Sequence, residues 1–400
     1  MKGIKKLHED TLSALHDIWD VYVGEVRRIF SDGGVVLIFV VATLLYPLIF
    51  GAIYENELVR NLPVAVVDES QSDDSRRFVK KLDATPEVNV AYKCRTMAEA
   101  ERLMKDRDIN GIVYFPRDYT QRLARHETAR IGLFCDMSSF LYYRSVYTGA
   151  SAVLVDEMRQ IQLDRYSLAG ITGESADELV TPIPYEDVKL YSQSGGFTSF
   201  LVPALLMLVL HQTLFLGIGI LGGTAQDAKR SLRAVPPRLR NRRRRRVTTG
   251  RALAYLGIYI PLSAVVLLWL PRLFGLPHVG ELTDLVLFVL PFLLATIFFS
   301  MTVSTFVRHR DSGIICTIFF SVVLLFLSGA VWPQCNMPAF WRWFGYLFPS
   351  THGIQGFIRI NSMGAHLSEV KFEYIMLWIQ TGVYFLTSCA SLRFLKKYRR

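Results

Sequence analysis

Six long apolar stretches constrain the fold of this 400-residue chain more than any other feature. Each is close to the roughly 20 residues that an α-helix needs to cross about 30 Å of hydrocarbon. A helix satisfies its own backbone polar groups in lipid, which an open strand cannot do. The sequence therefore predicts an α-helical polytopic membrane protein with six transmembrane helices. The stretches are Gly33–Tyr54, Phe197–Leu221, Ala252–Pro271, Leu285–Val307, Gly313–Val331 and Tyr374–Leu392.

Composition agrees with this class, because 51% of the residues are hydrophobic and only 20% are charged. The first stretch lacks the short apolar region and cleavage site of a removable signal peptide, so we expect it to stay in the membrane. The predicted segments are an amphipathic helix (1–32), transmembrane helix 1 (33–54), an extracytoplasmic α/β domain (55–196), helix 2 (197–222), a basic loop (223–251), helices 3–6 (252–395) and a basic tail (396–400).

Basic residues predict which loops face the cytoplasm. They gather before the first span, between the second and third, between the fourth and fifth, and after the sixth. The short loops on the other side are poorer in them. We therefore expect a multi-pass protein of the bacterial plasma (inner) membrane, with both termini cytoplasmic and 55–196 outside.

The long insertion at 55–196 has alternating strand and helix patterns. We expect strands over Leu62–Asp68, Val88–Cys94, Gly111–Pro116 and Ala129–Asp136. Helical stretches separate or follow them at Asp74–Leu82, Met97–Lys105, Tyr119–Arg125 and Ser139–Leu168. This alternation favours a mixed α/β layer over a sandwich. On the last helix, Val146, Val153, Val155, Met158 and Ile161 are among the apolar positions.

The amino-terminal 1–32 segment is strongly amphipathic, with apolar residues at helical spacing from Ile4 to Ile29. One interpretation places this helix flat on the inner membrane surface with Trp19 at headgroup level. The alternative is a helix that packs against a partner. The two are compatible.

The five cysteines include no Cys-x-x-Cys pair and no Cys/His spacing suited to zinc, so we expect no metal site. Cys94 and Cys135 fall on predicted strands of the insertion. They are either an external disulfide or two buried thiols.

Catalytic patterns are scarce. No Gly-Lys dipeptide occurs, which excludes a Walker A phosphate loop, and there is no HExxH or GxSxG. Asp106-Arg107-Asp108 matches the DxD of metal-dependent glycosyltransferases, but this tripeptide is common by chance. We expect a non-catalytic chain that binds no cofactor itself.

The loop after the fifth span is apolar, rich in aromatic residues and interrupted by prolines. Met337–Leu347 and Ser350–Ile360 each suit a helix too short to cross the membrane, with Ser350 as a candidate N-cap. We expect an external re-entrant hairpin over 333–360, and the alternative is an aromatic belt without function. The aromatic residues expected at the membrane interface are Trp332, Trp341, Trp343, Tyr346 and Phe348.

In this region the chain resembles the permease subunits of ABC-2 type ATP-binding cassette exporters, in particular their long external-domain, drug-efflux-like branch. The matching hairpin positions are Gly329, Pro333, Pro338, Pro349, Thr351, Gly353, Gly356 and Arg359. VAVVDES, GIVYFPRDY and SGGFTSFLVPALL also resemble family segments, so the likeness covers nearly the whole chain. The resemblance implies that the hairpin is an external gate.

The resemblance also implies that the loop after the second span docks on an ATPase subunit. Thr224, Asp227 and Pro236 roughly fit the family pattern there. The run Arg242–Arg246 departs from it, and three readings stay open: a basic loop held to anionic lipid, an ATPase contact, or the less favoured nucleic-acid binding.

Polar residues inside spans are candidates for a substrate path, while hydrogen bonding between helices is the simpler explanation. The candidates are His211, Gln212, Thr302 and Gln380, with Ser304, Thr305 and Thr381 nearby.

The resemblance implies an exporter of a hydrophobic or amphipathic substrate. Its partners would be a cytoplasmic ABC ATPase holding ATP and Mg²⁺, a second permease copy or paralogue, membrane lipid and an adaptor in the periplasm, with no nucleic acid. A membrane signalling or scaffold protein with an external sensor domain is the main alternative, and a membrane-embedded transferase is a third.

Overall fold

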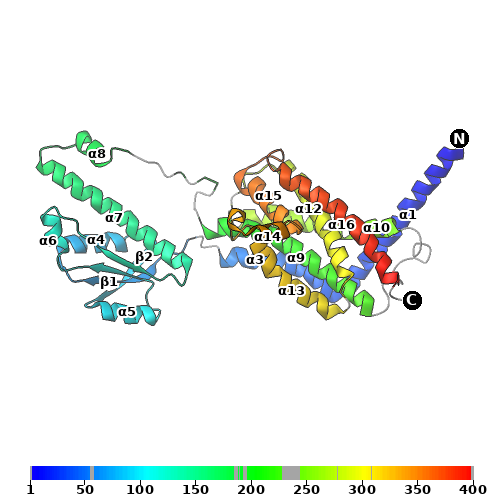
Figure 1. Ribbon diagram of the computed structural model, residues 1–400, viewed down its shortest axis with the longest axis horizontal. Coiled ribbons are helices and arrows are strands. Elements are labelled where there is room, and N and C mark those ends of the chain that lie inside the picture. The colour runs from blue at the N-terminus through cyan, green and yellow to red at the C-terminus, as the bar shows by residue number, and fades with distance from the viewer. Residues whose placement is uncertain are drawn as a thin grey trace. The chain divides into compact units, whose positions relative to one another are not determined.

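The computed structural model describes residues 2–54, 58–183, 188, 190–191, 196–227, 244–276, 278–307 and 309–397. The chain divides into two compact units. The smaller unit is Asn56–Val188, and the larger unit combines Met1–Glu55 with Lys189–Arg400. Figure 1 labels most elements of both.

Within the described residues, the regular elements of the larger unit are all helices. Its amino-terminal part contains α1 (Lys2–Ser31), α2 (Gly33–Val36), a π-helical segment (Leu37–Ala42) and α3 (Thr43–Ile53). The later elements are α9 (Phe197–Asp227), α10 (Arg244–Ala264), a π-helical segment (Val265–Trp269), α11 (Leu270–Leu273), α12 (Leu282–Ser304), α13 (Arg310–Leu327), a 3₁₀ turn (Gln334–Asn336), α14 (Ala339–Gly345), α15 (Pro349–Met363) and α16 (Lys371–Lys397).

Within the described residues, four helical stretches are long and apolar enough to cross a membrane. They are Gly33–Ile53, Phe197–Thr224, Arg244–Leu273 and Leu282–Ser304. The other two predicted spans fall on α13 and α16, which are helical but are not among these four. The chain is therefore a mostly helical polytopic membrane protein.

Two helices extend farther than predicted into the basic loop at 223–251. Helix α9 continues to Asp227, and α10 already begins at Arg244. Part of the predicted basic loop, including Arg244–Arg246, is therefore helical. Arginine is a good helix former, and this segment continues directly into an apolar span.

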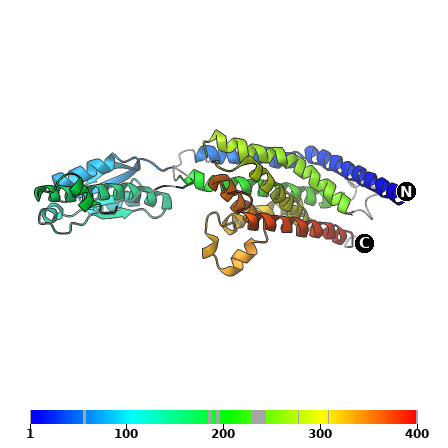
Figure 2. The ribbon, with the colours of Figure 1, turned by 90° about the horizontal axis from the view of Figure 1, so that it is seen from above.

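Helix α1 packs along α10, as Figure 2 shows. Val21 and Val247 bury each other at this contact. An added Cβ at Gly250 would lie 2.7 Å from the carbonyl oxygen of Ile18, so the two backbones approach closely there. The amino-terminal helix thus packs against a helix of its own chain, while Trp19 remains exposed.

The smaller unit is built on a four-stranded sheet in the order β2-β1-β3-β4. Strand β1 (Leu62–Asp68) pairs in parallel with β2 (Val88–Cys94) and β3 (Gly111–Phe115), and β3 pairs antiparallel with β4 (Gly132–Cys135). All four predicted strands are present, and the fourth is shorter than the predicted Ala129–Asp136. The first three are short runs rich in β-branched and aromatic residues, which favour strands.

Helices cover both faces of this sheet (Figure 1). One face packs against α4 (Asp73–Asp83), α6 (Tyr119–Ala124) and α7 (Phe140–Leu168), and the other against α5 (Met97–Lys105). A short helix, α8 (Glu174–Val180), lies against α7. Because β2 and β3 flank β1 on opposite sides, right-handed crossovers place α4 and α5 on opposite faces.

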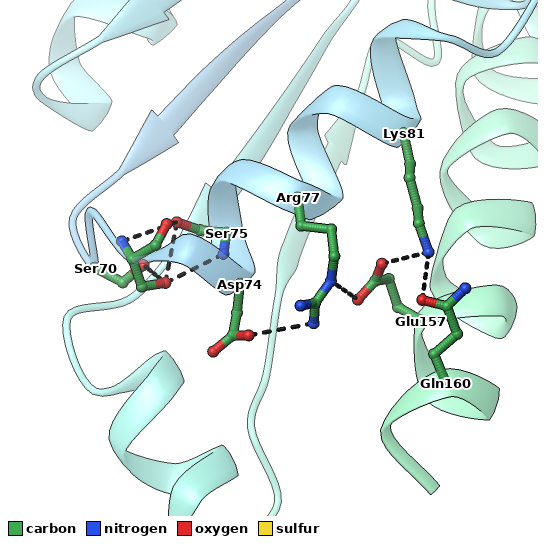
Figure 3. A network of polar contacts seen from close by, with 8 residues as sticks. Ser70, Asp74, Ser75, Arg77, Lys81, Glu157 and Gln160 are labelled. Carbon is green, nitrogen blue, oxygen red and sulfur yellow. Dashed lines mark hydrogen bonds and ion pairs between the residues drawn. The ribbon is translucent and has the colours of Figure 1, made fainter. Parts of the chain in front are cut away.

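A buried carboxylate joins α4 to α7 (Figure 3). Glu157 of α7 is 3% exposed and lies 3.3 Å from Nε of Arg77 and 2.7 Å from Nζ of Lys81. Lys81 also donates to Gln160, and Arg77 pairs with Asp74. Of the apolar positions named on α7, Val146 and Val153 are buried, whereas Val155 and Met158 are exposed.

Candidate functional site

The predicted hairpin forms two short helices, α14 and α15, joined at Tyr346–Phe348. Pro338 occupies the N-cap of α14, and Pro333 precedes the 3₁₀ turn. The N-cap of α15 is Phe348 with Pro349 at the first helical position, so the prediction of Ser350 as N-cap is wrong. Proline's fixed φ suits that first position and moves the cap upstream.

Aromatic residues of the hairpin divide into two groups. Trp332, Trp341 and Trp343 are 55%, 49% and 66% exposed, as an interfacial belt requires. Phe348 is buried instead, against Phe299, Phe320 and Phe344. The expectation that it lies at the interface is wrong, because it caps the buried helix α15.

Hydrogen bonds fasten α15 to α14 across the turn between them, and to the end of α13. The hydroxyl of Thr351 donates to the carbonyl of Gly345 over 2.7 Å. The side-chain amide of Gln355 donates to the carbonyl of Ser328 over 3.0 Å. Gly329 has a φ of +85°, which glycine adopts without strain, and it turns the chain out of α13 beside Gln355.

Glycines let α15 lie directly on α12. A Cβ at Gly353 would come within 2.3 Å of the Phe292 ring, and one at Gly356 within 2.2 Å of the Phe288 ring. Both phenylalanines are fully buried. Gly353 therefore packs inside the subunit, against Phe292.

An ion pair joins the other end of α15 to α16. Arg359 lies 3.1 Å from Glu373 and also donates to the carbonyl of Glu369. Glu373 is 7% exposed. The predicted hairpin residues from Gly329 to Arg359 thus lie in or beside the helix pair α14–α15, which contacts α13, α12 and α16.

The first turn of α15 carries buried polar groups without hydrogen-bond partners among the described residues. They are the hydroxyl of Ser350 and both ring nitrogens of His352. The His352 ring lies 5.1 Å from that of Tyr346 and 5.8 Å from that of Phe372. Gln380 of α16 donates to the carbonyl of Tyr346 over 2.8 Å, while its own oxygen lacks a partner in the described part.

His211 lies at the edge of an aromatic cluster. Its ring is fully buried in α9, 5.9 Å from Phe299 and 6.4 Å from Phe215, and neither nitrogen has a hydrogen bond to a described residue. Phe299 also contacts Tyr384 and Phe348. The structure thereby links His211 to the hairpin through Phe299.

The remaining polar candidates in the spans differ in their contacts. Thr302 bonds the carbonyl of Phe298 and lies 3.0 Å from the hydroxyl of Thr387, so it joins α12 to α16. Gln212 is partly buried, and its polar groups are not left without a partner. Hydrogen bonding between helices explains Thr302, but it leaves His211 unexplained.

Thr224 lies in the last turn of α9, and its hydroxyl has no partner among described residues. Asp227 ends that helix, but its side chain lies outside the described residues, as do Pro236, Arg242 and Arg243. Arg246 pairs with Asp17 of α1 over 2.5 Å.

The disulfide alternative is wrong, because Cys94 and Cys135 are free. They lie on β2 and β4, the two outer strands of the sheet. Three strand spacings of about 4.8 Å separate such strands by roughly 14 Å, whereas a disulfide needs Cα atoms within about 7 Å. Burial raises the pKa of both thiols.

Among the described residues, one group of side chains has metal-ligand chemistry: Glu281, Asp284 and His366, with ligand atoms within 4.8 Å of one another. Two of the three are exposed. Hydrogen bonding between His366 and Asp284 over 3.1 Å explains their proximity.

The sequence analysis did not identify four features of this region. They are the unpartnered hydroxyl of Ser350, the buried ring of His352, the position of Phe299 between His211 and Phe348, and the buried carboxylate of Glu25 in α1. For Glu25 a signal exists, because it follows Val21 and precedes Ile29 by four residues and so lies on the apolar stripe. No comparable signal marks His352, since its burial depends on α16.

Comparison with known families gives one match over most of the chain. The family described as ABC-2 family transporter protein matches residues 34–390. No curated protein matches.

Proposed function

The chain belongs to the ABC-2 family of transporter proteins, and from this premise we propose that it is the permease subunit of an exporter driven by a separate ATPase. In this proposal α13 and α16 complete six spans, both termini are cytoplasmic and the smaller unit lies outside the bacterial plasma membrane. A second copy or a paralogue completes the pathway. ATP and Mg²⁺ bind to the ATPase, and an adaptor in the periplasm receives the substrate.

The observation that carries the proposal is the burial of α15. This 15-residue helix is too short to cross a membrane, yet it packs against α9, α12 and α16. Its polar first turn holds Ser350 and His352 without partners in the described structure. Unsatisfied buried polar groups destabilise a fold by about 1–3 kcal/mol each, so their retention supports a functional role.

The hairpin has the features of a gate. Thr351 joins the two hairpin helices, while Gln355 and Arg359 attach α15 to the end of α13 and to α16. Gly353 and Gly356 pack α15 on α12, so a shift of α12, α13 or α16 would move the hairpin as a unit. The aromatic cluster around Phe299 continues from the hairpin to His211. Such an apolar cluster suits a hydrophobic or amphipathic substrate, with His211 as a polar contact along the path.

The proposal is tested by ATP hydrolysis. We expect the purified chain to show none above background, because it has no Gly-Lys phosphate loop, and a co-purified cassette subunit to supply it. Substitution of the Walker A lysine in that subunit should abolish hydrolysis by the complex and transport together. Robust hydrolysis by the chain alone would contradict the proposal.

A further inference from the structure

A groove in the smaller unit lies between α4 and the outer strand β2. It takes side chains from α4, from β2 and from the segments that follow β1 and β3. The groove therefore opens at the carboxyl edge of the parallel strands, where ligands of open α/β sheets bind. Its volume of about 1160 Å³ is enough for a small organic molecule.

A shift in the register of β2 leaves room for this groove. The pairing shifts by one residue between Val64 and Ala65, which leaves Ala91 of β2 without a partner in β1. Such a bulge re-aims the side chains that follow it. It brings Lys93 opposite Val66, on the sheet face that α4 covers. A lysine thus occupies a position where an apolar residue would extend the core.

Three basic side chains of the groove have no acidic partner among the described residues. They are Lys80 of α4, Lys93 of β2 and Arg95, which follows β2, and all three are exposed. A fourth, Arg76, pairs with Asp73 over 2.8 Å. Basic side chains gathered in one concave surface attract anions.

The acidic residues of the groove are engaged in other contacts. Asp68 accepts hydrogen bonds from the turn after β1 and from α4. Asp83 accepts a hydrogen bond of 2.8 Å from the backbone of Val90, and Glu69 lies 3.3 Å from Arg117. These carboxylates therefore leave the charges of Lys80, Lys93 and Arg95 uncompensated.

The floor of the groove is apolar. Val66 is buried, and Val79 and Val90 are partly buried beside it. Lysine and arginine also cover apolar surface with their hydrocarbon stems while their charged ends stay in water. A ligand that fills the groove would therefore gain from apolar burial as well as from charge.

We propose that this groove binds an amphipathic anion, that is, a small molecule with an apolar body and a carboxylate or phosphate head group. The three valines contact the body, and Lys80, Lys93 and Arg95 bind the head group. The site lies wholly within the smaller unit. It goes beyond the proposed function, because it requires neither an ATPase nor a particular topology.

Photolabelling of the full chain in lipid nanodiscs tests the site. The probe is decanoate with a diazirine near the end of its chain, and matched probes carry a phosphate head group or a methyl ester. Crosslinks to residues 76–96 are quantified by mass spectrometry after chymotryptic digestion, relative to crosslinks in the membrane spans. The span crosslinks correct for the partition of each probe into lipid.

We expect at least one anionic probe to label residues 76–96 about tenfold more than the methyl ester does, because three exposed ionic contacts are lost with the ester. The comparison of the carboxylate with the phosphate identifies the head group. Replacing all three basic residues by glutamine should reduce the labelling by a similar factor. The substitutions are Lys80→Gln, Lys93→Gln and Arg95→Gln.

The matched control removes three exposed basic residues outside the groove and should leave the labelling within about twofold of the parent. Its substitutions are Arg102→Gln, Lys105→Gln and Arg125→Gln. Excess octanoate should displace the probe, whereas the same concentration of acetate should not, because acetate has no apolar body. This competition uses the parent chain, so it decides the question even if a triple variant fails to fold.

Three results would each overturn the inference and leave the proposed function intact. They are equal labelling by the methyl ester, parent-like labelling in the folded groove variant, and equal displacement by acetate. ATP hydrolysis by the chain alone would contradict the proposed function without affecting this site.

Discussion

Glu25 and Glu157 are two buried carboxylates, and each lies beside two basic side chains. An ion taken out of water loses several kcal/mol of solvation, so a buried carboxylate remains charged only with such partners. Glu157 itself is 3% exposed, but its partners Arg77 and Lys81 remain 44% and 28% exposed, so the two basic side chains keep part of their contact with water. The loss of stability should therefore depend on whether the carboxylate or its basic partners are removed.

Removing the cations should therefore destabilise the smaller unit more than removing the carboxylate. We expect Arg77→Ala with Lys81→Ala to lower the free energy of unfolding by about 3–5 kcal/mol, since Glu157 is left buried and unpaired. Glu157→Gln should lower it by only about 1–2 kcal/mol. Urea-dependent labelling of the buried Cys94 in the full chain measures both, and Arg76→Ala is the control. Equal effects would contradict this explanation.

His366, in the loop before α16, should make the stability of the fold depend on pH. Its hydrogen bond to Asp284, with Glu281 nearby, raises the pKa of His366 above its ordinary 6.5. A raised pKa in the folded state gives stability that is present below pH 6.5 and is lost as pH rises through the folded pKa.

Thermal unfolding of the full chain at pH 6 and pH 8 checks this. His366→Gln should reduce the difference between the two pH values. The control is His126→Asn, since asparagine tolerates the positive φ of 59° at that exposed position. An unchanged pH dependence in His366→Gln would show that the pair contributes nothing.

At the scale of elements, helix contacts explain which residues the hairpin needs. Gly353 and Gly356 bring α15 onto the rings of Phe292 and Phe288, so their role is close packing. Length and turn residues predict that α14 and α15 are helices. They do not predict which face of α15 meets α12, because that choice depends on side chains some sixty positions away.

Enlarging Gly353 should therefore act through stability. Gly353→Ala forces the Phe292 ring to move and should destabilise the larger unit by about 1–3 kcal/mol. A second substitution, Phe292→Leu, makes room and should recover part of that loss. Gly382→Ala, with nothing near its Cβ position, is the control. Thermal unfolding in detergent compares the four proteins, and a tolerated Gly353→Ala would show that the contact yields easily.

For the whole molecule, the main prediction is the topology, that is, which residues lie on the cytoplasmic side of the membrane and which lie outside. Thr248 is fully buried and lies beside Cys389, so it cannot serve as a site for labelling. Arg245 and Glu101 are exposed in the larger and smaller units respectively. Both suit a single cysteine in a cysteine-free background.

With an impermeant thiol reagent, Glu101→Cys should react in intact spheroplasts and Arg245→Cys only after lysis. The basic residues around Arg245 should hold that end of α10 inside, since positive charge near a span favours the cytoplasm. Both sites react after lysis if the protein is folded, which is the internal control. Reaction of Arg245→Cys in intact cells would reverse the proposed topology.

The sequence by itself determined the kinds of elements. Apolar length predicted spans, alternation predicted the four strands, and prolines marked the hairpin, because these signals come from neighbouring residues. Family membership was also available from motif order. Only the tertiary structure decided that Glu25 lies buried against Tyr255, that Gly353 lies against Phe292, and that Cys94 and Cys135 are too far apart to bond. Glu25 and Tyr255 are 230 positions apart, and contacts at such separations depend on how whole helices and strands pack.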